Sequence, residues 1–250
     1  MRDYSIFEKF NFEYQPVGVS FSLKKPQGIR QLDTPLAICE MFKVAQTSEP
    51  FYATIDEVQC GTQVVGMEDF PPVMVSGQLG SKFSMFKSTS ANRRVYDYVP
   101  VLNRDIARYI VHAPLDKLSF DPDLLIITCN TAQAEVLMRA SSYSDGRMWH
   151  SKGSTCLACA WYYAYPYVSG ELNFGISGMG FSMKARDVLP DGLIIISIPS
   201  EMLSMMIENL QEIEWDPIWF NLGRDGFVEA VKGLEAQLAA ELPSDLVWEN

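Results

Sequence analysis

Residues 124–141 read LLIITCNTAQAEVLMRAS, and this stretch contains a strand followed directly by a helix. Leu124–Thr128 is an unbroken apolar run with the length of a buried strand. Downstream, apolar side chains recur at Ala134, Leu137 and Met138, the spacing of a helix that buries one face. A strand that leads into a helix without a long linker predicts a domain that mixes sheet and helix.

The same signals extend along the chain in both directions. Apolar, β-prone runs predict strands, and a capping residue or proline before a periodic apolar run predicts a helix. The expected strands are 17–23, 51–54, 109–112, 124–128, 172–176 and 193–198, and a β-like region begins at 73–76. The expected helices are 34–45, 56–66, 131–141, 200–213 and 225–241, while 156–163 is compatible with a helix or an extended segment. This mixture with short connections predicts an α+β fold of mixed sheets and helices.

The length of 250 residues suits a single domain. Its expected parts are two internal halves, about 12–115 and 116–215, and a C-terminal helical extension over 216–250. The segment at Thr34 resembles the segment at Asn130, and the same offset of 96 residues carries Cys60 onto Cys156. A duplication would give two pseudo-symmetric α/β halves with these cysteines facing each other, and a chance match is the alternative.

The net charge of −11 is concentrated near the C-terminus. Eleven Asp and Glu residues follow Pro199, against Arg224 and Lys232. This acidic region disfavours nucleic acid as a partner, because phosphates are repelled. It is either a solvated helical face or a docking surface for a basic protein partner. We expect a soluble, cytoplasmic protein with no membrane partner, since no apolar run approaches the ~20 residues of a membrane span and no secretory signal is evident.

Five cysteines without a secretory signal argue against a disulfide framework. Cys156 and Cys159 are spaced to share one face of a helix. With Cys39 and Cys60 they provide four thiolates, which suit zinc or an iron–sulfur cluster. Only one Cys-x-x-Cys pair is present, so the alternative is that individual thiols fill the core, as we expect for Cys129.

Cys60 is also the candidate for a nucleophile. It precedes Gly61, and Asp56 is expected to cap a helix whose exposed N–H groups would favour the thiolate. The base would have to be His112 or His150. His112 is typical of a structural histidine at a strand end and His150 of an exposed loop, so the sequence shows no catalytic triad.

Two further segments suggest a small-molecule ligand. The glycine-rich segment 177–184 resembles an anion-binding loop but lacks the spacing of a phosphate-binding motif. The aromatic run 161–167 could stack a planar ligand. A flexible hairpin and ordinary core packing are the alternatives for these segments. The candidate ligand contacts are Gly61, Trp161, Gly178, Gly180 and Lys184.

Several short motifs follow one another in an order that is characteristic of a known family. They are 15–21 (QPVGVSF), 39–41 (CEM), 51–54 (FYAT), Cys60-Gly61 with Gly66, 113–115 (APL), 122–123 (PD), 169–173 (SGELN) and 198–199 (IP). Over about residues 10–215 the chain resembles the domain of unknown function family one hundred and sixty-nine, found in archaea and anaerobic bacteria. The resemblance implies no settled activity. The family's cysteine segments match Cys39, Cys60 and the pair Cys156/Cys159, whereas the basic residue expected after the glycines comes late, at Lys184.

These observations give three functional hypotheses. The leading one is a cysteine-lined site between the halves that binds an iron–sulfur cluster or another thiophilic metal in anaerobic metabolism. Its ligands would be Cys60, Cys156 and Cys159, with Cys39 as a fourth. The second is a non-catalytic binding module for a planar or anionic small molecule, and the third is a thiol-dependent enzyme that uses Cys60. The sequence leaves open whether the protein is an enzyme.

Overall fold

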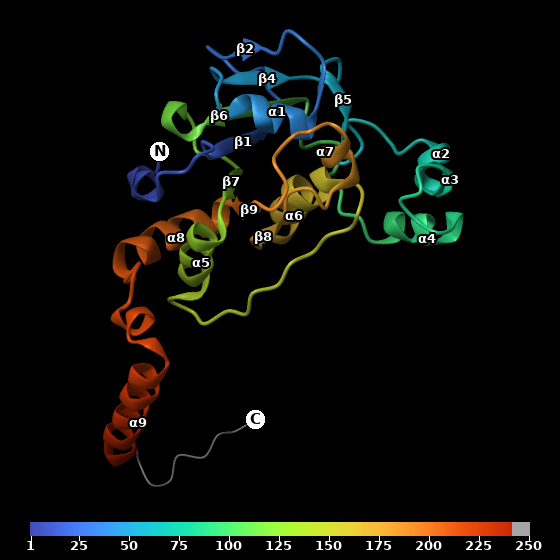
Figure 1. Ribbon diagram of the computed structural model, residues 1–250. Helices are drawn as coiled ribbons and strands as arrows, with labels where there is room; N and C mark the ends of the chain where they lie inside the picture. The colour runs from blue at the N-terminus through green and yellow to red at the C-terminus, as the bar shows by residue number, and fades with distance from the viewer. Residues whose placement is uncertain (242–250) are drawn as a thin grey trace. The chain divides into compact units, whose positions relative to one another are not determined.

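The computed structural model describes residues 1–241 and contains two compact units, Met1–Gln211 and the segment that follows it. The first unit is built on one seven-stranded sheet with helices around it (Figure 1), so the expected α+β fold is confirmed. The strands are β1 (Val17–Ser22), β2 (Arg30–Gln31), β3 (Leu36–Ala37), β4 (Phe51–Ala53), β5 (Val58–Cys60), β6 (Tyr109–Pro114), β7 (Leu124–Cys129), β8 (Asn173–Ile176) and β9 (Ile194–Pro199). The large sheet has the order β2-β4-β6-β1-β7-β9-β8, while β3 and β5 pair separately.

The helices differ widely in length. The α-helices are α1 (Ile38–Ala45), α2 (Pro72–Val75), α3 (Gln78–Lys82), α4 (Thr89–Arg93), α5 (Thr131–Ser142), α6 (Tyr165–Ser169), α7 (Phe181–Ala185), α8 (Ser200–Glu212) and α9 (Gly223–Glu241). The 3₁₀ helices are η1 (Ser5–Phe10), η2 (Arg94–Asp97), η3 (Leu115–Lys117) and η5 (Ile218–Asn221), and η4 (Ala160–Ala164) is a π-helix. None of the described helices is long and apolar enough to cross a membrane.

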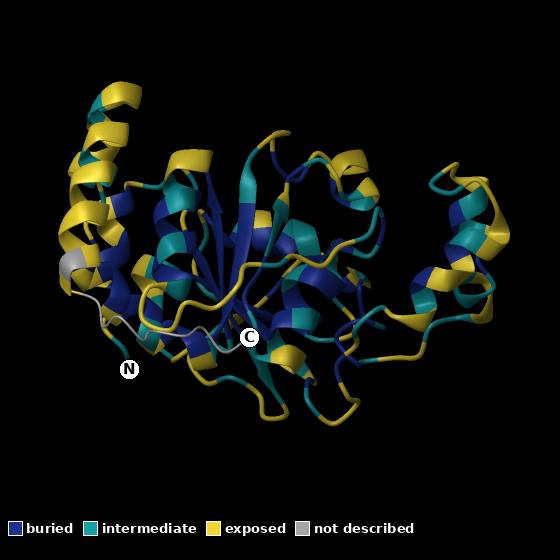
Figure 2. Cartoon of the chain, turned by 90° about the horizontal axis from the view of Figure 1, so that it is seen from below, coloured by how far each residue is buried: buried dark blue, intermediate teal, exposed yellow. Residues whose placement is uncertain are grey.

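Both faces of the sheet are covered, which explains why its central strands are apolar throughout. Side chains alternate between faces along β7. Thr128 lies on the face of α1, where its hydroxyl accepts a hydrogen bond from Gln46 at 3.3 Å. Leu125 and Ile127 point to the other face and are buried there, outside the core cluster that contains α1. Figure 2 shows the buried strands in dark blue with helices around them. Cys129 has the same parity as Leu125, so the sheet separates this buried thiol from α1.

The strand order is mirrored about the pair β1 and β7. On one side the order is β1-β6-β4 and on the other β7-β9-β8, with antiparallel pairing at each step. Side chains of α1 belong to the core cluster on one face of the sheet, whereas no side chain of α5 does, so the helices do not follow this arrangement. An internal duplication therefore remains a prediction.

Three local predictions are wrong for identifiable reasons. The expected helix 56–66 is replaced by β5, because Gly61 has a φ of +101°, which no α-helix accommodates. The β-like region 73–76 is helical, since Pro72 occupies the first position of α2 and has the φ that a helix needs. The helix expected from residue 34 begins only at Ile38, because the preceding residues pair with β5.

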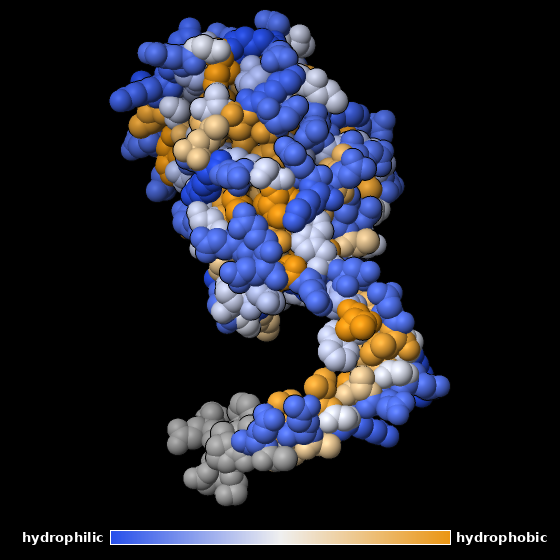
Figure 3. Space-filling model, turned by 90° about the vertical axis from the view of Figure 1, so that its left-hand side faces the viewer, coloured by the Kyte–Doolittle hydropathy of each residue, from blue (hydrophilic) through white to orange (hydrophobic). Residues whose placement is uncertain are grey.

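The second unit contains η5 and α9, and the helix expected at 225–241 is confirmed. Apolar residues appear on the surface of this unit (Figure 3), among them Ile218, Phe227 and Leu238. The predicted extension over 216–250 includes residues 242–250, which lie outside the described residues. Its role as a docking surface for a basic partner remains a prediction.

Candidate functional site

Four of the five cysteines line one pocket in the first unit. Its volume is about 530 Å³, and Cys39, Cys60, Cys156 and Cys159 all contribute to its wall. These residues come from α1, from β5 and from the loop that precedes η4. The fold therefore brings together thiols that are far apart in the sequence, and we call this cavity the cysteine pocket.

The position of Cys39 is set by the start of α1. The Glu40 carboxylate accepts a hydrogen bond from the Ala37 backbone N–H at 2.8 Å and so caps the helix. The fully buried Ile38 faces the core, while its carbonyl accepts a hydrogen bond from the Tyr163 hydroxyl at 3.3 Å. With both neighbours fixed in this way, Cys39 in the first turn is directed to the pocket.

Cys60 ends β5, where it pairs with Ala37 of β3. The chain then turns at Gly61. A Cβ atom at Gly61 would lie 3.4 Å from the Cys159 Sγ, which shows how closely the Cys60 segment approaches Cys159. The short β3–β5 ladder is therefore the element that brings Cys60 beside Cys39 and Cys159.

Cys156 and Cys159 do not share a helical face as their spacing predicted. Leu157, between them, has a φ of +58°, in the left-handed region. Only Cys159 belongs to the helical segment that leads into η4. Cys156 lies before the turn and close to Tyr96, whose pKa is raised by burial and by the nearby Cys156.

The pKa values separate Cys156 from the other three thiols. Burial, and to a smaller extent the neighbouring Cys60, raises the pKa of Cys39 to about 11. The pKa of Cys159 lies well above its usual value through burial and through Cys60 and Cys39. Burial also raises the pKa values of Cys60 and Cys156, but no other cysteine contributes to either. Cys39, Cys60 and Cys159 therefore form a trio that we call the thiol cluster.

Arg186, which follows α7, is the cationic group at this cluster. Its charge lowers the pKa values of Cys39 and Cys60, although burial outweighs it. Its Nε atom lies 3.4 Å from the Glu40 carboxylate. The three thiols are protonated at neutral pH in this environment, so Cys60 lacks the lowered pKa of an activated nucleophile.

The geometry of the thiols does not by itself define a metal site. Within residues 1–241, no three His, Cys, Asp or Glu side chains are arranged as ligands of one ion. The donor set is nevertheless soft, because three methionines also line the pocket. These thioethers belong to Met74, Met85 and Met183. Thiolates and thioethers are the ligands preferred by copper(I), zinc and iron–sulfur clusters.

A helical segment over residues 71–98, which we call the flap, forms one side of the pocket. It comprises α2, α3, α4 and η2, whose helices pack chiefly on one another. Phe83 of the flap lies with its ring 6.1 Å from that of Phe181 in α7. Asn92 and Tyr96 also line the pocket from this side. No sequence motif marks the residues of the flap as a pocket wall, so this part of the site is not predictable from the sequence.

The predicted ligand contacts are distributed over different places. Gly61 lies beside the thiol cluster, whereas Trp161 and Gly180 line an adjacent cavity of about 490 Å³. The two cavities share Ala158 and Met183 in their walls. Lys184 instead forms an ion pair with Asp191 at 2.6 Å.

Gly178 lies beside the same carboxylate as Lys184. A Cβ atom at Gly178 would lie 2.1 Å from Asp191 Oδ1, and Gly178 has a φ of +85°. Gly178 and Lys184 thus belong to a glycine turn that Asp191 stabilises. The structure does not bring them to the cysteine pocket or to the adjacent cavity.

Most rings of the aromatic run 161–167 are used in packing. Tyr163 is buried, and its hydroxyl lies 3.2 Å from the Nε2 atom of His112. His112 is fully buried within β6, and burial lowers its pKa to about 3. Tyr167 contacts Phe21 edge to face. His112 is therefore structural, although it lies inside the strand and not at its end.

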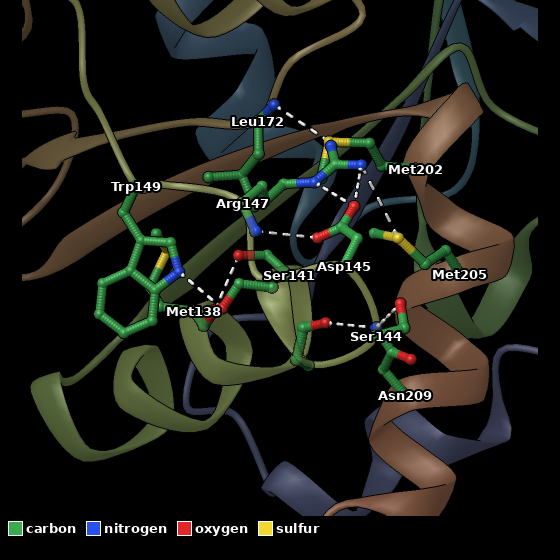
Figure 4. Close-up of polar contacts among 12 residues, drawn as sticks. Met138, Ser141, Ser144, Asp145, Arg147, Trp149, Leu172, Met202, Met205 and Asn209 are labelled. Atoms are coloured by element: carbon green, nitrogen blue, oxygen red, sulfur yellow. Dashed lines mark hydrogen bonds and ion pairs between the residues drawn. The ribbon is translucent and has the colours of Figure 1, made fainter. Parts of the chain in front are cut away.

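A third cavity, of about 440 Å³, lies between α5, α8 and the loop after α5 (Figure 4). In it the Arg147 guanidinium bonds to Asp145 and points at the sulfur atoms of Met202 and Met205, at 3.6 and 4.0 Å. His150 also lines this cavity.

His150 lies in a loop, as the sequence suggested, but its side chain is only partly exposed and has hydrogen-bond partners. Its Nε2 atom lies 2.8 Å from Glu171, and the Tyr165 hydroxyl donates to the same carboxylate oxygen at 2.6 Å. These bonds lower the pKa of Glu171. His150 lines a different cavity from the cysteines, so the structure pairs neither histidine with Cys60 as a base.

Comparison with known proteins identifies relatives but no activity. An uncharacterized protein of Methanocaldococcus jannaschii, MJ0308, is 28% identical over 191 residues, which cover 74% of this chain and 81% of the relative. No solved structure matches the chain. The model of the family DUF169, described as uncharacterised ArCR, matches residues 5–209 and so includes the whole thiol cluster. The resemblance seen in the sequence motifs is thus confirmed, and the chain belongs to the DUF169 family.

Proposed function

We propose that the cysteine pocket binds a thiophilic metal, either as an iron–sulfur cluster or as a single ion. The observation that supports the proposal is that Cys39, Cys60 and Cys159, from three separate segments, line one pocket and influence one another's pKa values. Placing three thiols side by side in a pocket wall has no packing advantage that apolar side chains would not provide equally. A metal ion that replaces the thiol protons would stabilise the folded protein by its binding free energy.

The raised pKa values of the three thiols are consistent with a site for a metal cation that thiolates coordinate. The raised pKa values of the three thiols arise from burial and from one another. A bound metal ion would offset both effects, because its positive charge deprotonates the thiols that coordinate it. Arg186 would balance the excess negative charge of a thiolate-bound cluster. Cys156 is available as a fourth ligand from the opposite side of Leu157.

We also propose a cellular compartment for the protein. The five cysteines are all free among the described residues. Free thiols persist in a reducing compartment, so we place the protein in the cytoplasm. An iron–sulfur cluster there would give it a part in anaerobic metabolism.

The test is metal and sulfide analysis of protein purified without oxygen. We expect a fixed ratio of metal to chain, and absorbance near 400 nm if the metal is an iron–sulfur cluster. The variants Cys39→Ala, Cys60→Ala and Cys159→Ala should lose the metal. Cys129→Ala is the control, because this thiol lies on the other face of the sheet and does not line the pocket. Folded protein without iron, sulfide, zinc, copper or nickel would refute the proposal.

A further inference from the structure

The cavity beside the cysteine pocket has the properties of a separate ligand site, and we call it the aromatic cavity. Its volume is about 490 Å³, and cavities of about 300–1,000 Å³ typically hold small organic molecules. Trp161, Tyr162 and Phe174 contribute aromatic rings to its wall. Two exposed apolar side chains, Ile176 and Met179, also line it. A planar molecule in this cavity would bury its surface against rings and a thioether.

One buried side chain fixes two walls of the aromatic cavity relative to each other. Asn173 in β8 is fully buried, and its Oδ1 atom accepts a hydrogen bond from the Lys152 backbone N–H at 2.9 Å. Its Nδ2 atom donates to the Lys152 and Trp161 carbonyls, at 3.0 and 2.7 Å. The indole N–H of Trp161 donates to Ser154 Oγ at 3.0 Å. The loop over residues 151–155 is thus bound to η4, and the cavity is formed before any ligand enters.

The π-helix η4 places Trp161 and Tyr162 in this wall. Single π-helical turns are rare and occur frequently at functional sites. Side chains from the sheet bond to the carbonyls of both residues. The Trp161 carbonyl accepts from Asn173, and the Tyr162 carbonyl accepts from the Ser197 hydroxyl at 2.7 Å. The two rings are therefore held in place although the turn is irregular.

The Tyr162 hydroxyl is a free polar group that faces the aromatic cavity. It has no hydrogen-bond partner among residues 1–241, and its oxygen is not fully buried. A Cβ atom at Gly175 would overlap this oxygen, and Gly175 lines the aromatic cavity. The other void that Tyr162 lines has a volume of only about 10 Å³ and does not include Gly175. Burial raises the pKa of Tyr162 to about 12, so the hydroxyl keeps its proton at neutral pH and can donate it in a hydrogen bond.

The charge of the wall favours an anion. In the described part of the chain, Lys152 is the only charged residue that lines the aromatic cavity, although the net charge is −11. Its side chain is exposed and forms no ion pair among residues 1–241. The pKa of Glu171 is lowered mainly by its bonds to Tyr165 and His150 and least by Lys152, so the ammonium is not bound to that carboxylate. A cation and a hydroxyl donor together suit a carboxylate, which accepts hydrogen bonds and carries negative charge.

We propose that the aromatic cavity binds a small aromatic carboxylate. The ring lies against Trp161 and Phe174, the carboxylate accepts a hydrogen bond from the Tyr162 hydroxyl, and Lys152 balances its charge. This site goes beyond the thiol cluster, and its occupation requires no metal. The aromatic cavity and the cysteine pocket share only Ala158 and Met183 in their walls.

Three probes of similar size test the class of ligand. They are benzoate, benzamide, which keeps the ring but has no charge, and cyclohexanecarboxylate, which keeps the charge but is not planar. Binding is followed by NMR of isotope-labelled methionine methyl groups. Of the two cavities, Met179 lines only the aromatic one, Met183 lines both, and Met74 and Met85 line only the cysteine pocket. We expect benzoate to shift Met179 and Met183, with an affinity about tenfold above that of either counterpart.

Two variants connect binding to the named groups. Tyr162→Phe removes only a hydroxyl that has no partner among the described residues, so the fold should be retained. Its affinity for benzoate should fall about five- to tenfold. Lys152→Met, in an exposed loop, should weaken binding roughly three- to tenfold and remove most of its dependence on salt. Tyr143→Phe and Lys184→Met are the controls, because neither residue lines the aromatic cavity, and both should bind benzoate as the unaltered protein does.

The possible results either support or overturn the inference. A benzoate shift at Met179 that both variants weaken supports it. No shift, shifts confined to Met74 and Met85, a counterpart that binds as tightly as benzoate, or an unchanged affinity in either variant would overturn it. If Tyr162→Phe does not fold, the comparison of probes and Lys152→Met decide. Cys60→Ala, which should lose the metal, should bind benzoate normally, so this inference and the metal proposal can fail separately.

Discussion

The backbone of Gly61 lies so close to the Cys159 thiol that a side chain on Gly61 would touch the sulfur atom. A Cβ atom at Gly61 would lie 3.4 Å from the Cys159 Sγ and 2.8 Å from Ile38 Cδ1. Gly61 also has a φ of +101°, a backbone conformation that residues other than glycine rarely adopt. The residue after Cys60 is therefore restricted by its backbone and by its surroundings.

Replacing Gly61 by alanine should affect stability and metal content together. The strained backbone costs about 1–3 kcal/mol, and the added methyl group pushes Ile38 and narrows the space at the thiol cluster. Urea denaturation and metal analysis measure the two effects. Gly28→Ala is the control, since Gly28 has a φ of +72° with nothing within 4 Å of its Cβ position. Gly28→Ala should lose stability but keep its metal. Metal loss in both variants would contradict a specific effect of Gly61 on the thiol cluster.

Arg186→Met should weaken metal binding. The charge of Arg186 lowers the pKa values of Cys39 and Cys60. Its loss makes the thiols harder to deprotonate, and metal affinity depends on deprotonation. Because the side chain is partly exposed, we expect a loss of roughly three- to tenfold, measured by competition with a chelator. Lys184→Met removes a charge two residues earlier, in α7, that is paired with Asp191, and should have no effect.

The metal-free protein should lose stability at alkaline pH. Burial raises the pKa of Cys39 from its ordinary value of 9.0 to about 11. A group that binds its proton more tightly in the folded state stabilises the fold below its unfolded pKa and loses that contribution as pH rises through its folded pKa. The free energy of unfolding should therefore fall between pH 9 and pH 11, by about 1–2 kcal/mol for this group. In Cys39→Ala the decline should be smaller, and an unchanged pH profile would argue against a buried thiol at this position.

Acid should destabilise the protein through His112. Burial lowers the pKa of His112 from 6.5 to about 3, so the folded state favours the neutral ring. The stability that this provides is complete above pH 6.5 and is lost as pH falls toward 3. In His112→Leu the unfolding free energy should depend less on pH in this range. At pH 7 the variant should be about 1–3 kcal/mol less stable, because the Tyr163 hydroxyl loses its contact with the ring. Equal acid sensitivity of both proteins would contradict this assignment.

The central strands and their neighbouring helices were predictable, because each is a local pattern. The strand 124–128 and helix 131–141 correspond to β7 and α5, and 193–198 and 200–213 correspond to β9 and α8. Apolar runs and capping residues within these segments are sufficient to determine them, without contacts to the rest of the chain. The helix expected around Cys60 failed because pairing between β3 and β5, a tertiary interaction, outweighed the local signal.

The site was predictable only in part. Cysteines are few and chemically distinctive, so their gathering could be expected from residue type and family motifs. Asn92 and Met74 carry no such signal, since asparagine and methionine are common in loops and cores. Their role depends on how the flap folds back toward α7, which is visible only in three dimensions.

The flap differs from the rest of the pocket in how it is anchored. Cys39 and Cys60 stand on segments that also carry core side chains such as Ile38, so changes there disturb the sheet. Residues 71–98 pack chiefly among themselves. Substitutions in the flap should therefore reshape one wall of the pocket while leaving the sheet intact, whereas substitutions at Cys39 or Cys60 would alter both.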